Sequence, residues 1–368
     1  MSQVRSDKFT SAVRGMHHRG MTLQFPTPLA RGQRVFVTAP SSGVEPALHA
    51  RLDLTLQHLR QQGFVVEEGR CLRHEARSAS APADERAAEL MQALLRDDVA
   101  AIIPPWGGEL AIELLDRLDW AALASARPKW LLGYSDTSTL LVPMTLRLGW
   151  ATAHGPCLMD LVAGQDDPLT GAAMGLLGTP TGARFTQRQS SHWQRQWTDF
   201  ALLPDCSYRL TEPTVWRALQ GQAELQFSGR LIGGCLDTLM HTAGTAHGDV
   251  TAFIRKHCES GDGTILYLEN AGLSPTDWVR AVHRLRWAGW LDKLAGALIG
   301  RSAAPDTTAA TELRYAEALQ ATLGALPCPV LVDVDIGHLP PQMVLVNGAL
   351  ANVQWSVTAG GLLTQTLA

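Results

Sequence analysis

Short apolar runs alternate with segments of helical periodicity along the first half of the chain, and this alternation limits the fold more than any other feature. The apolar runs occupy residues 34–39, 64–66, 99–103 and 129–133. Helices are expected between them: over 48–62, where four leucines share one stripe before Gly63, over 84–95 with Asp84 as N-cap, and over 109–118. Strands separated by helices of this length predict βαβ units, and therefore an α/β fold with a mostly parallel sheet.

Ligands of such sheets bind where the strands end at their carboxyl edge. Three loops follow predicted strands at that edge, over residues 40–43, 104–108 and 133–136. We therefore look for functional residues first in these three loops.

The second half of the chain repeats the pattern after an interruption. Residues 179–226 are rich in Gln, Thr, Pro and Trp, and we interpret them as a linker or an irregular excursion over the surface. Further strands are expected at 229–234, 264–268, 296–300, 330–334, 343–346 and 350–355, with helices through His241 and over 277–287. The predicted domains are thus 28–178 and 227–368. They follow a disordered or ragged N-terminus, residues 1–27, in which Met21 is a second candidate start.

Composition excludes several classes of protein. Lys and Arg number 31 against 35 Asp and Glu, so the net charge is 31 − 35 = −4, without the basic excess of a nucleic-acid binder. No polybasic run favours anionic lipid, no apolar stretch approaches the ~18 residues of a membrane span, and the first 27 residues lack the apolar core of a secretory signal. Six scattered cysteines without a CxxC pair are typical of reduced thiols in a cytoplasmic protein. Zinc is not expected, because HExxH is absent and His241 and His247 fall on different helix faces.

The sequence GYSDT at 133–137 is the sharpest chemical signal. Ser135 stands between an apolar strand and a helical stretch that begins near Thr137. A serine on such a strand-to-helix turn projects its hydroxyl from the top of the sheet, and the N–H of Asp136 would point to the same place. The alternative is an ordinary helix cap, since Ser and Asp both cap helices well.

Gly107 and Gly108 likewise end a strand and precede a helical pattern. Two glycines let the backbone approach a substrate closely, and one N–H there could complete an oxyanion hole. The alternative is a simple tight turn. Neither GxGxxG nor GxxxxGK[ST] occurs in the chain, so no nucleotide cofactor is expected.

A nucleophilic serine needs a base, and the base needs an acceptor that orients it. Glu269 ends a predicted strand, and His338 follows another. His154, in the sequence HGP, is a rival base, and the residues alone do not decide between the two histidines.

These motifs, taken in order, resemble the LD-carboxypeptidase and microcin C self-immunity family of serine peptidases. The resemblance runs from about residue 34 to residue 353. It rests on Gly107-Gly108, residues 133–137, 154–156, Gly233-Gly234, Leu268-Glu269 and Gly337-His338, with support from 37–42 and 287–291.

The resemblance implies roles for individual residues. Ser135 would be the nucleophile, Glu269 the acid and His338 the histidine of the triad, which decides against His154. The N–H groups of Asp136 and Gly107 would form the oxyanion hole. The implied fold places a doubly wound domain before a smaller α/β domain with the site between them, and the implied assembly is a homodimer without a cofactor.

Departures from the family pattern concern specificity. Cys235 stands where the family usually has Asn, and Asn270 stands where Asp is usual. Trp197 resembles a ligand-facing tryptophan of the self-immunity branch, although it could simply pack a long loop. With Gly108, these three residues are the candidate substrate contacts.

The resulting hypothesis is a serine carboxypeptidase or amidase that cleaves an L,D-amide in a murein-type peptide. The alternative substrate is the amide of an aminoacyl-nucleotide analogue, as in microcin C self-immunity. An alternative from another class is a non-catalytic ligand-binding protein, against which the complete set of Ser135, Glu269 and His338 argues.

Overall fold

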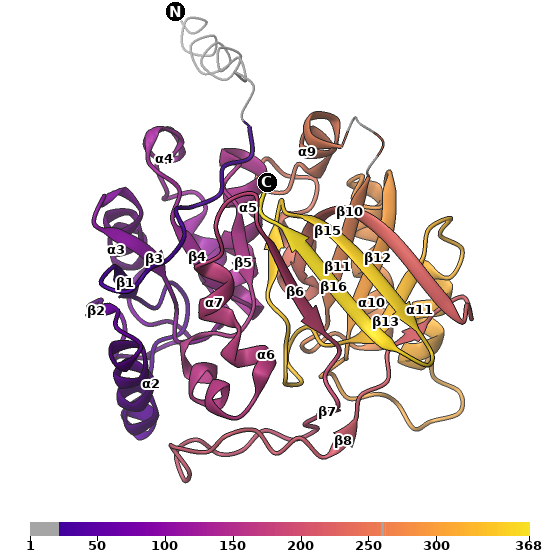
Figure 1. Cartoon of the computed structure of the whole chain (residues 1–368), viewed down its shortest axis with the longest axis horizontal. Helices are drawn as coiled ribbons and strands as arrows, with labels where there is room; N and C mark the ends of the chain where they lie inside the picture. The colour runs from indigo at the N-terminus through magenta and orange to yellow at the C-terminus, as the bar shows by residue number, and fades with distance from the viewer. Residues whose placement is uncertain (1–21, 259–260, 262) are drawn as a thin grey trace, which may run out of the picture.

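The computed structural model describes residues 22–258, 261 and 263–368, which form two β-sheets side by side (Figure 1). The first sheet has the strand order β14-β5-β4-β3-β1-β2, and all its pairings are parallel except that of β14 with β5. Its strands are β1 (Arg34–Val37), β2 (Val65–Glu68), β3 (Val99–Ile102), β4 (Trp130–Gly133), β5 (Thr152–His154) and β14 (Leu345–Asn347). The strands predicted at 34–39, 64–66, 99–103 and 129–133 are confirmed, with ends shifted by one or two residues.

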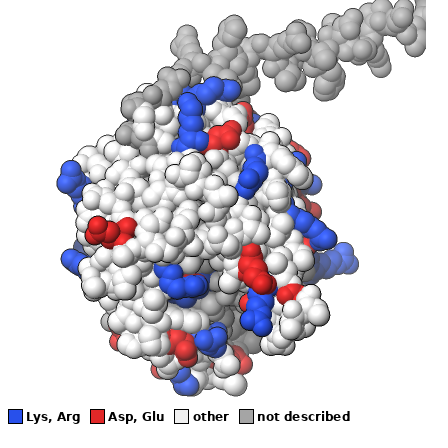
Figure 2. Space-filling model, turned by 90° about the vertical axis from the view of Figure 1, so that its right-hand side faces the viewer, with Lys and Arg blue, Asp and Glu red and all other residues white. Residues whose placement is uncertain are grey.

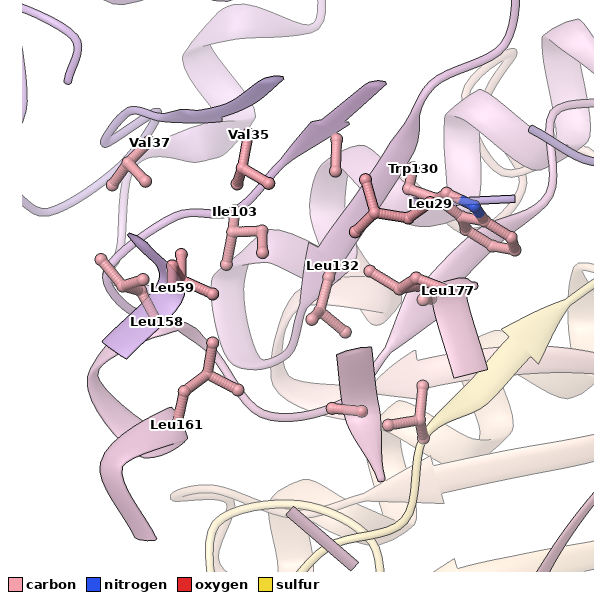
Figure 3. Close-up of a cluster of buried hydrophobic side chains, with 14 of the residues drawn as sticks. Leu29, Val35, Val37, Leu59, Ile103, Trp130, Leu132, Leu158, Leu161 and Leu177 are labelled. Atoms are coloured by element: carbon pink, nitrogen blue, oxygen red, sulfur yellow. The ribbon is translucent and has the colours of Figure 1, made fainter. Parts of the chain in front are cut away.

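Helices cover both faces of the first sheet, so its doubly wound architecture is confirmed. One face packs against α2 (His49–Gln61), the 3₁₀ helix η4 (Leu158–Gln165) and α7 (Ala173–Leu177). Figure 3 shows this core, in which Val35 and Leu132 of the strands, and Ile103 directly after β3, lie near Leu59 and Leu177 of the helices. The opposite face packs against α3 (Ala83–Leu95), α4 (Trp120–Ser125) and α5 (Ser138–Leu148).

The second sheet has four parallel central strands with antiparallel strands at both sides. Its order is β6-β16-β15-β10-β11-β12-β13-β9. The strands are β6 (Arg184–Arg188), β9 (Arg217–Ala218), β10 (Glu224–Cys235), β11 (Thr264–Glu269), β12 (Leu294–Gly300), β13 (Val330–Val334), β15 (Leu350–Ser356) and β16 (Gly360–Thr366). Four helices pack on one face: α8 (Leu236–Thr242), α9 (Val250–His257), α10 (Pro275–Trp287) and α11 (Tyr315–Leu323).

Three expected elements need correction. The helix expected over 109–118 shrinks to η2 (Ala111–Leu114), because the main-chain N–H groups of residues 113, 115 and 117 donate to the carbonyls three residues before them, the pattern of a 3₁₀ turn and not of an α-helix. Asp84 lies in the first turn of α3, whose N-cap residue is Pro82. The strand expected at 343–346 begins at Leu345 and joins the first sheet, so the C-terminal stretch 227–368 supplies a strand to both sheets.

Two boundary segments are more ordered than the sequence pattern indicates. Residues 179–226, interpreted as a linker or excursion, supply β6 and β9 to opposite sides of the second sheet and the small pair β7 (His192–Trp193) and β8 (Glu212–Pro213). Within the stretch 1–27, the Gln24 N–H donates to the carbonyl of residue 149, and the Gln24 carbonyl accepts from the N–H of residue 151. The chain is therefore ordered at Gln24, where a ragged end was expected. Residues 1–21, and with them Met21, lie outside the described residues.

The surface carries no extended field of one sign on the face that Figure 2 shows, where acidic and basic side chains are interspersed. Within the described part of the chain, no helix combines the length and apolarity needed to cross a bilayer. The mixture of acidic and basic side chains on this face agrees with the small net charge of the chain, −4.

Asn347, at the end of β14, joins the two sheets through its buried side chain. Its Oδ1 accepts hydrogen bonds from the Gly233 N–H of β10 and the Tyr267 hydroxyl of β11, and its Nδ2 donates to Thr152 of β5. The side chain is fully buried, so water cannot replace these partners.

Replacing this residue, Asn347→Ala, should therefore lower the free energy of unfolding by about 2–4 kcal/mol, since it strands several buried donors and acceptors. Urea unfolding followed by tryptophan fluorescence measures the effect. The control is Asn352→Ala, which removes only a surface hydrogen bond to Ser228 and should change stability by less than about 0.5 kcal/mol. Equal midpoints for the two variants would contradict this linking role of Asn347.

Candidate active site

Ser135 occupies a strained turn at the carboxyl edge of the first sheet. It follows β4 by two residues and opens the single 3₁₀ turn η3 (Ser135–Thr137), after which α5 begins. Its φ of 59° lies in the left-handed region, which a residue with a side chain rarely adopts. Such a turn leaves the hydroxyl at the top of the sheet, where it can react.

The buried carboxylate of Asp136 anchors this turn to the two neighbouring loops. Its Oδ2 accepts hydrogen bonds from Ser41 Oγ at 2.6 Å and from the Ala111 N–H at 2.8 Å. Its Oδ1 accepts from Thr139 Oγ1 at 3.1 Å. The loops that follow β1, β3 and β4 are thus tied to one side chain, immediately beside Ser135.

Gly107 packs so closely against Ser135 that the space between them leaves no room for a side chain on residue 107. A Cβ on Gly107 would stand 2.6 Å from Ser135 Cβ and 2.8 Å from both Ser135 Oγ and the Asp136 N atom. The main chain at 107 therefore borders the same small space as the Asp136 N–H. Gly108, in contrast, has a φ of 136° and packs on Ser41 and Ser42.

Glu269 and His338 come from the second sheet and meet Ser135 across the junction. Glu269 is the last residue of β11, and His338 lies in the loop after β13. His338 Nδ1 lies 2.8 Å from Glu269 Oε2, and His338 Nε2 lies 3.0 Å from Ser135 Oγ. The structure thus brings together three of the residues predicted from the sequence, although 203 residues separate Ser135 from His338 along the chain.

The protonation of these groups follows from their surroundings. Burial alone would raise the pKa of Glu269, but the charge of His338 and its hydrogen bond outweigh burial and lower it. Glu269 is therefore an ionised, acceptor-only carboxylate, so His338 Nδ1 donates and Nε2 is left to accept from the Ser135 hydroxyl.

The pKa of His338 itself is raised above its ordinary value of 6.5. Burial opposes this change, but the carboxylate of Glu269 outweighs it, with smaller contributions from Asp237 and Asp160. Tyr134 packs its ring against the imidazole, with centroids 5.0 Å apart at 67°.

His154, the rival base, lies in the core and not against Ser135. It is fully buried, and neither ring nitrogen has a hydrogen-bond partner among the described residues. Burial lowers its pKa to about 4, so the ring is neutral. Its neighbours are the edges of Tyr134 and Tyr267, with centroids at 6.4 and 5.3 Å.

The candidate substrate contacts Cys235 and Asn270 are both buried beside Glu269. Cys235 pairs with Glu269 in register between β10 and β11, and its N–H donates to Ser138 Oγ at 3.1 Å. Asn270 Nδ2 donates to the Leu273 carbonyl and to Ser302, while its Oδ1 accepts from the Leu273 N–H. The amide of Asn270 therefore closes a turn and does not face an open surface.

Trp197 lies on the excursion between β7 and β8, which runs below α6 (Pro168–Gly171) toward α2 in Figure 1. The residue is 42% exposed, and its ring meets those of Phe200 and Tyr208 edge-on, with centroids 6.1 and 6.4 Å apart. Arg51 of α2 holds the excursion by donating to the carbonyls of residues 204 and 206 at 3.0 and 2.6 Å. Trp197 thus packs the excursion with part of its ring and exposes the rest.

Four further residues that surround Ser135, His338 and Glu269 were not predicted from the sequence. Tyr134 stands within the GYSD motif, and Arg301 and Asp335 directly follow β12 and β13, so position at the carboxyl edge could have identified these three. Asp160 is buried in η4, and desolvation raises its pKa to about 6. Among the described residues, no three His, Cys, Asp or Glu side chains gather in a way that could hold a metal ion.

Comparison with protein-family models places both halves of this geometry in one family. Residues 35–155 match the LD-carboxypeptidase N-terminal domain, and residues 228–353 match the LD-carboxypeptidase C-terminal domain. Ser135 lies in the first match, and Glu269 and His338 lie in the second.

Curated relatives cover nearly the whole chain. A protein of Streptomyces coelicolor named as a carboxypeptidase is 30% identical over 89% of this chain and 92% of its own. A Bacillus subtilis protein named as a murein peptide carboxypeptidase is 28% identical over 89% and 90%. The microcin C7 self-immunity protein MccF of Escherichia coli is 26% identical over 87% and 90%.

A solved structure of MccF in complex with glutamyl sulfamoyl guanosine has the same fold. It superposes with a TM-score of 0.77 at 22% identity and covers 93% of this chain and 99% of its own. The two family matches and the full-length relatives agree with the resemblance noted in the sequence, and the chain therefore belongs to the LD-carboxypeptidase family of serine peptidases.

Proposed function

We propose that Ser135, His338 and Glu269 form the catalytic triad of a carboxypeptidase that cleaves an amide bond. The observation that carries this proposal is the continuous chain of contacts from Glu269 Oε2 through the imidazole to Ser135 Oγ, 2.8 and 3.0 Å long. A hydroxyl is a weak nucleophile unless a positioned base takes its proton, and this arrangement supplies such a base.

In the first half of the reaction, Ser135 Oγ attacks the carbonyl carbon of the substrate amide and His338 Nε2 takes the hydroxyl proton. Glu269 stabilises the imidazolium that forms. The main chain of Gly107 and the Asp136 N atom border the space beside Oγ, and we propose that the N–H groups of these two residues bind the oxyanion of the tetrahedral intermediate. His338 then gives its proton to the leaving amine, and water releases the acyl group by the reverse sequence of proton transfers.

The substrate we propose is a murein-type peptide, cleaved at an L,D-amide bond near its carboxyl end. The LD-carboxypeptidase family and the Bacillus subtilis relative support this choice. Asn270 and Cys235 differ from the family pattern beside Glu269, and because both are buried, we propose that they affect the choice of substrate indirectly and not by contact.

A second candidate substrate is the amide of an aminoacyl-nucleotide analogue. The observation that favours it is Trp197, whose half-exposed ring on the excursion offers a face on which a base could stack. The relative MccF is named for microcin C7 self-immunity, and its solved complex contains glutamyl sulfamoyl guanosine.

We also propose that the protein works in the cytoplasm and as a homodimer, as the family resemblance implies. Free thiols support a reducing compartment. They belong to Cys71, Cys157, Cys206, Cys235 and Cys328.

Replacing the nucleophile, Ser135→Ala, should abolish hydrolysis while leaving the fold intact. Mass spectrometry of products, after incubation with a murein tetrapeptide and separately with an aminoacyl-sulfamoyl adenosine, shows which amide the wild-type chain cleaves. The control Ser228→Ala alters an exposed serine of β10 and should keep full activity. Undiminished cleavage by the Ser135→Ala variant would disprove the triad.

The pH profile should depend on Glu269. The base must be neutral to accept a proton, so the acid limb of kcat/KM should have its midpoint above 6.5, where Glu269 raises the pKa of His338. In Glu269→Gln the charge is lost and burial remains, so the midpoint should move to lower pH and kcat should fall by about 10²–10⁴. An unchanged acid limb in this variant would show that another group sets the pH dependence.

A methyl group at position 107 should fill the space proposed for the oxyanion. Gly107→Ala places Cβ 2.8 Å from Ser135 Oγ and from the Asp136 N atom, so kcat should fall by at least about 10²-fold. The matched control is Gly175→Ala, where nothing lies within 4 Å of the new Cβ and activity should not change. Equal activity of the two variants would rule out an oxyanion site beside Gly107.

A further inference from the structure

A buried ion pair lies behind the loop that carries His338. Arg301 directly follows β12 and Asp335 directly follows β13, and Arg301 Nη1 lies 2.7 Å from Asp335 Oδ1. The two side chains are only 5% and 0% exposed. Burying two charges costs free energy that their attraction alone often fails to recover, so such a pair calls for a reason other than stability.

Arg301 also donates hydrogen bonds to main-chain carbonyls that lie before and after His338 in the chain. Its Nη2 donates to the carbonyl of Leu339 and to that of Pro341, both at 3.0 Å. Its main-chain N–H donates to the Val334 carbonyl at 3.3 Å. One guanidinium therefore ties the end of β13 to the residues that follow His338.

Asp335 connects the same loop to both ends of the excursion that carries Trp197. Its carboxylate accepts from Ser190 Oγ at 2.6 Å and the Ser190 N–H at 2.9 Å, just before β7. It also accepts from Trp216 Nε1 at 3.0 Å, just after β8. Its own carbonyl accepts from the Met343 N–H at 2.7 Å, where the loop ends.

We propose that Arg301 and Asp335 are positioning residues that hold the His338 imidazole between Ser135 and Glu269. This inference rests on the proposed function, because it concerns how the base of that triad is placed. Neither residue takes part in the hydrogen bonds that join Ser135, His338 and Glu269. Arg301 and Asp335 instead hold the main chain of the loop from which the imidazole projects.

Such positioning has a measurable signature. Displacing a catalytic group by about 1 Å can cost about 10²-fold in rate without weakening substrate binding. A displaced imidazole also loses part of its contact with Glu269, which is the charge that raises the pKa of His338. A purely structural role would lower stability but would leave both the kcat and the pH profile of the folded fraction unchanged.

The structure also offers a route for chemical rescue. Arg301 lines a cavity of about 590 Å³ together with Trp193, Tyr315 and Leu339. The Arg301 guanidinium lies 5.5 Å from the ring centroid of Trp193. Guanidinium ion from solution can therefore reach the place that the arginine head group leaves in an Arg301→Ala variant.

The experiment compares Arg301→Ala with Arg230→Ala, using the murein tetrapeptide or whichever substrate the wild-type chain cleaves. Arg230 also donates to three carbonyls, those of residues 257, 348 and 368, but it lies in the middle of β10, and none of its partners belongs to the loop that carries His338. In Arg301→Ala we expect kcat to fall about 10²-fold with KM nearly unchanged, and the acid limb to move to lower pH. Guanidinium chloride at low concentration should restore kcat at least tenfold, and equal sodium chloride should not.

If Arg301→Ala does not fold, the conservative variant Arg301→Lys tests the positioning role of Arg301. Lysine keeps the charge but cannot make the forked contacts, so we expect a smaller loss of kcat and the same direction of the acid-limb shift. A folded Arg301 variant with wild-type kcat and wild-type pH profile overturns the proposal. So does an equal kcat loss in Arg230→Ala.

Failure of the proposed function is recognised separately. If Ser135→Ala retains hydrolysis, the triad is wrong whatever Arg301 does. The position of the imidazole can then still be tested without activity, by NMR titration of His338 in Ser135→Ala with and without Arg301→Lys. We expect the pKa of His338 to be lower when Arg301 is replaced, and an identical titration would refute the positioning role.

Discussion

Two consecutive hydrogen bonds, from Ser135 to His338 and from His338 to Glu269, are the interaction on which the account of this protein depends. They cross from one sheet to the other, and neither sheet holds both ends. Glu269 is fully buried, and its charge is tolerated because the imidazole donates a hydrogen bond to it and becomes positively charged when it takes up a proton. The packing of α5 against both sheets and the placement of β14 in the first sheet bring the two carboxyl edges together at this point.

Three buried carboxylates, those of Asp136, Glu269 and Asp335, hold different parts of the site, each through its own hydrogen-bond partners. Asp136 fixes the loops around the proposed oxyanion space through Ser41 and the Ala111 N–H. Glu269 orients the imidazole. Asp335, paired with Arg301, fixes the loop that carries the imidazole and both ends of the excursion. Ser135, His338 and the excursion are therefore each held by one charged side chain in buried surroundings, where hydrogen bonds to charged groups are strong.

Much of this arrangement could be predicted from the sequence, because the central parallel strands of both sheets are mostly short apolar runs bounded by clear turn residues. Ser135, Glu269 and His338 follow such runs, and the order of motifs identified the family. The sequence pattern failed where tertiary contacts decide the local structure. The backbone of residues 109–118 forms hydrogen bonds of the 3₁₀ type instead of a regular α-helix, and β14, from the C-terminal part of the chain, pairs with β5 of the first sheet. The Arg301–Asp335 pair was not found either, since a charged residue after a strand looks like an ordinary solvated one until its partner is known.

The central claim is that the Ser135 hydroxyl is activated by the imidazole of His338. The most direct measurement is labelling of the intact chain by a serine-directed fluorophosphonate, followed by peptide mapping and mass spectrometry. The account predicts one modification, on Ser135, in the wild-type chain, and its loss in the folded His338→Ala variant. Labelling of Ser135 at the same rate in both proteins, or its absence from both, would contradict the account.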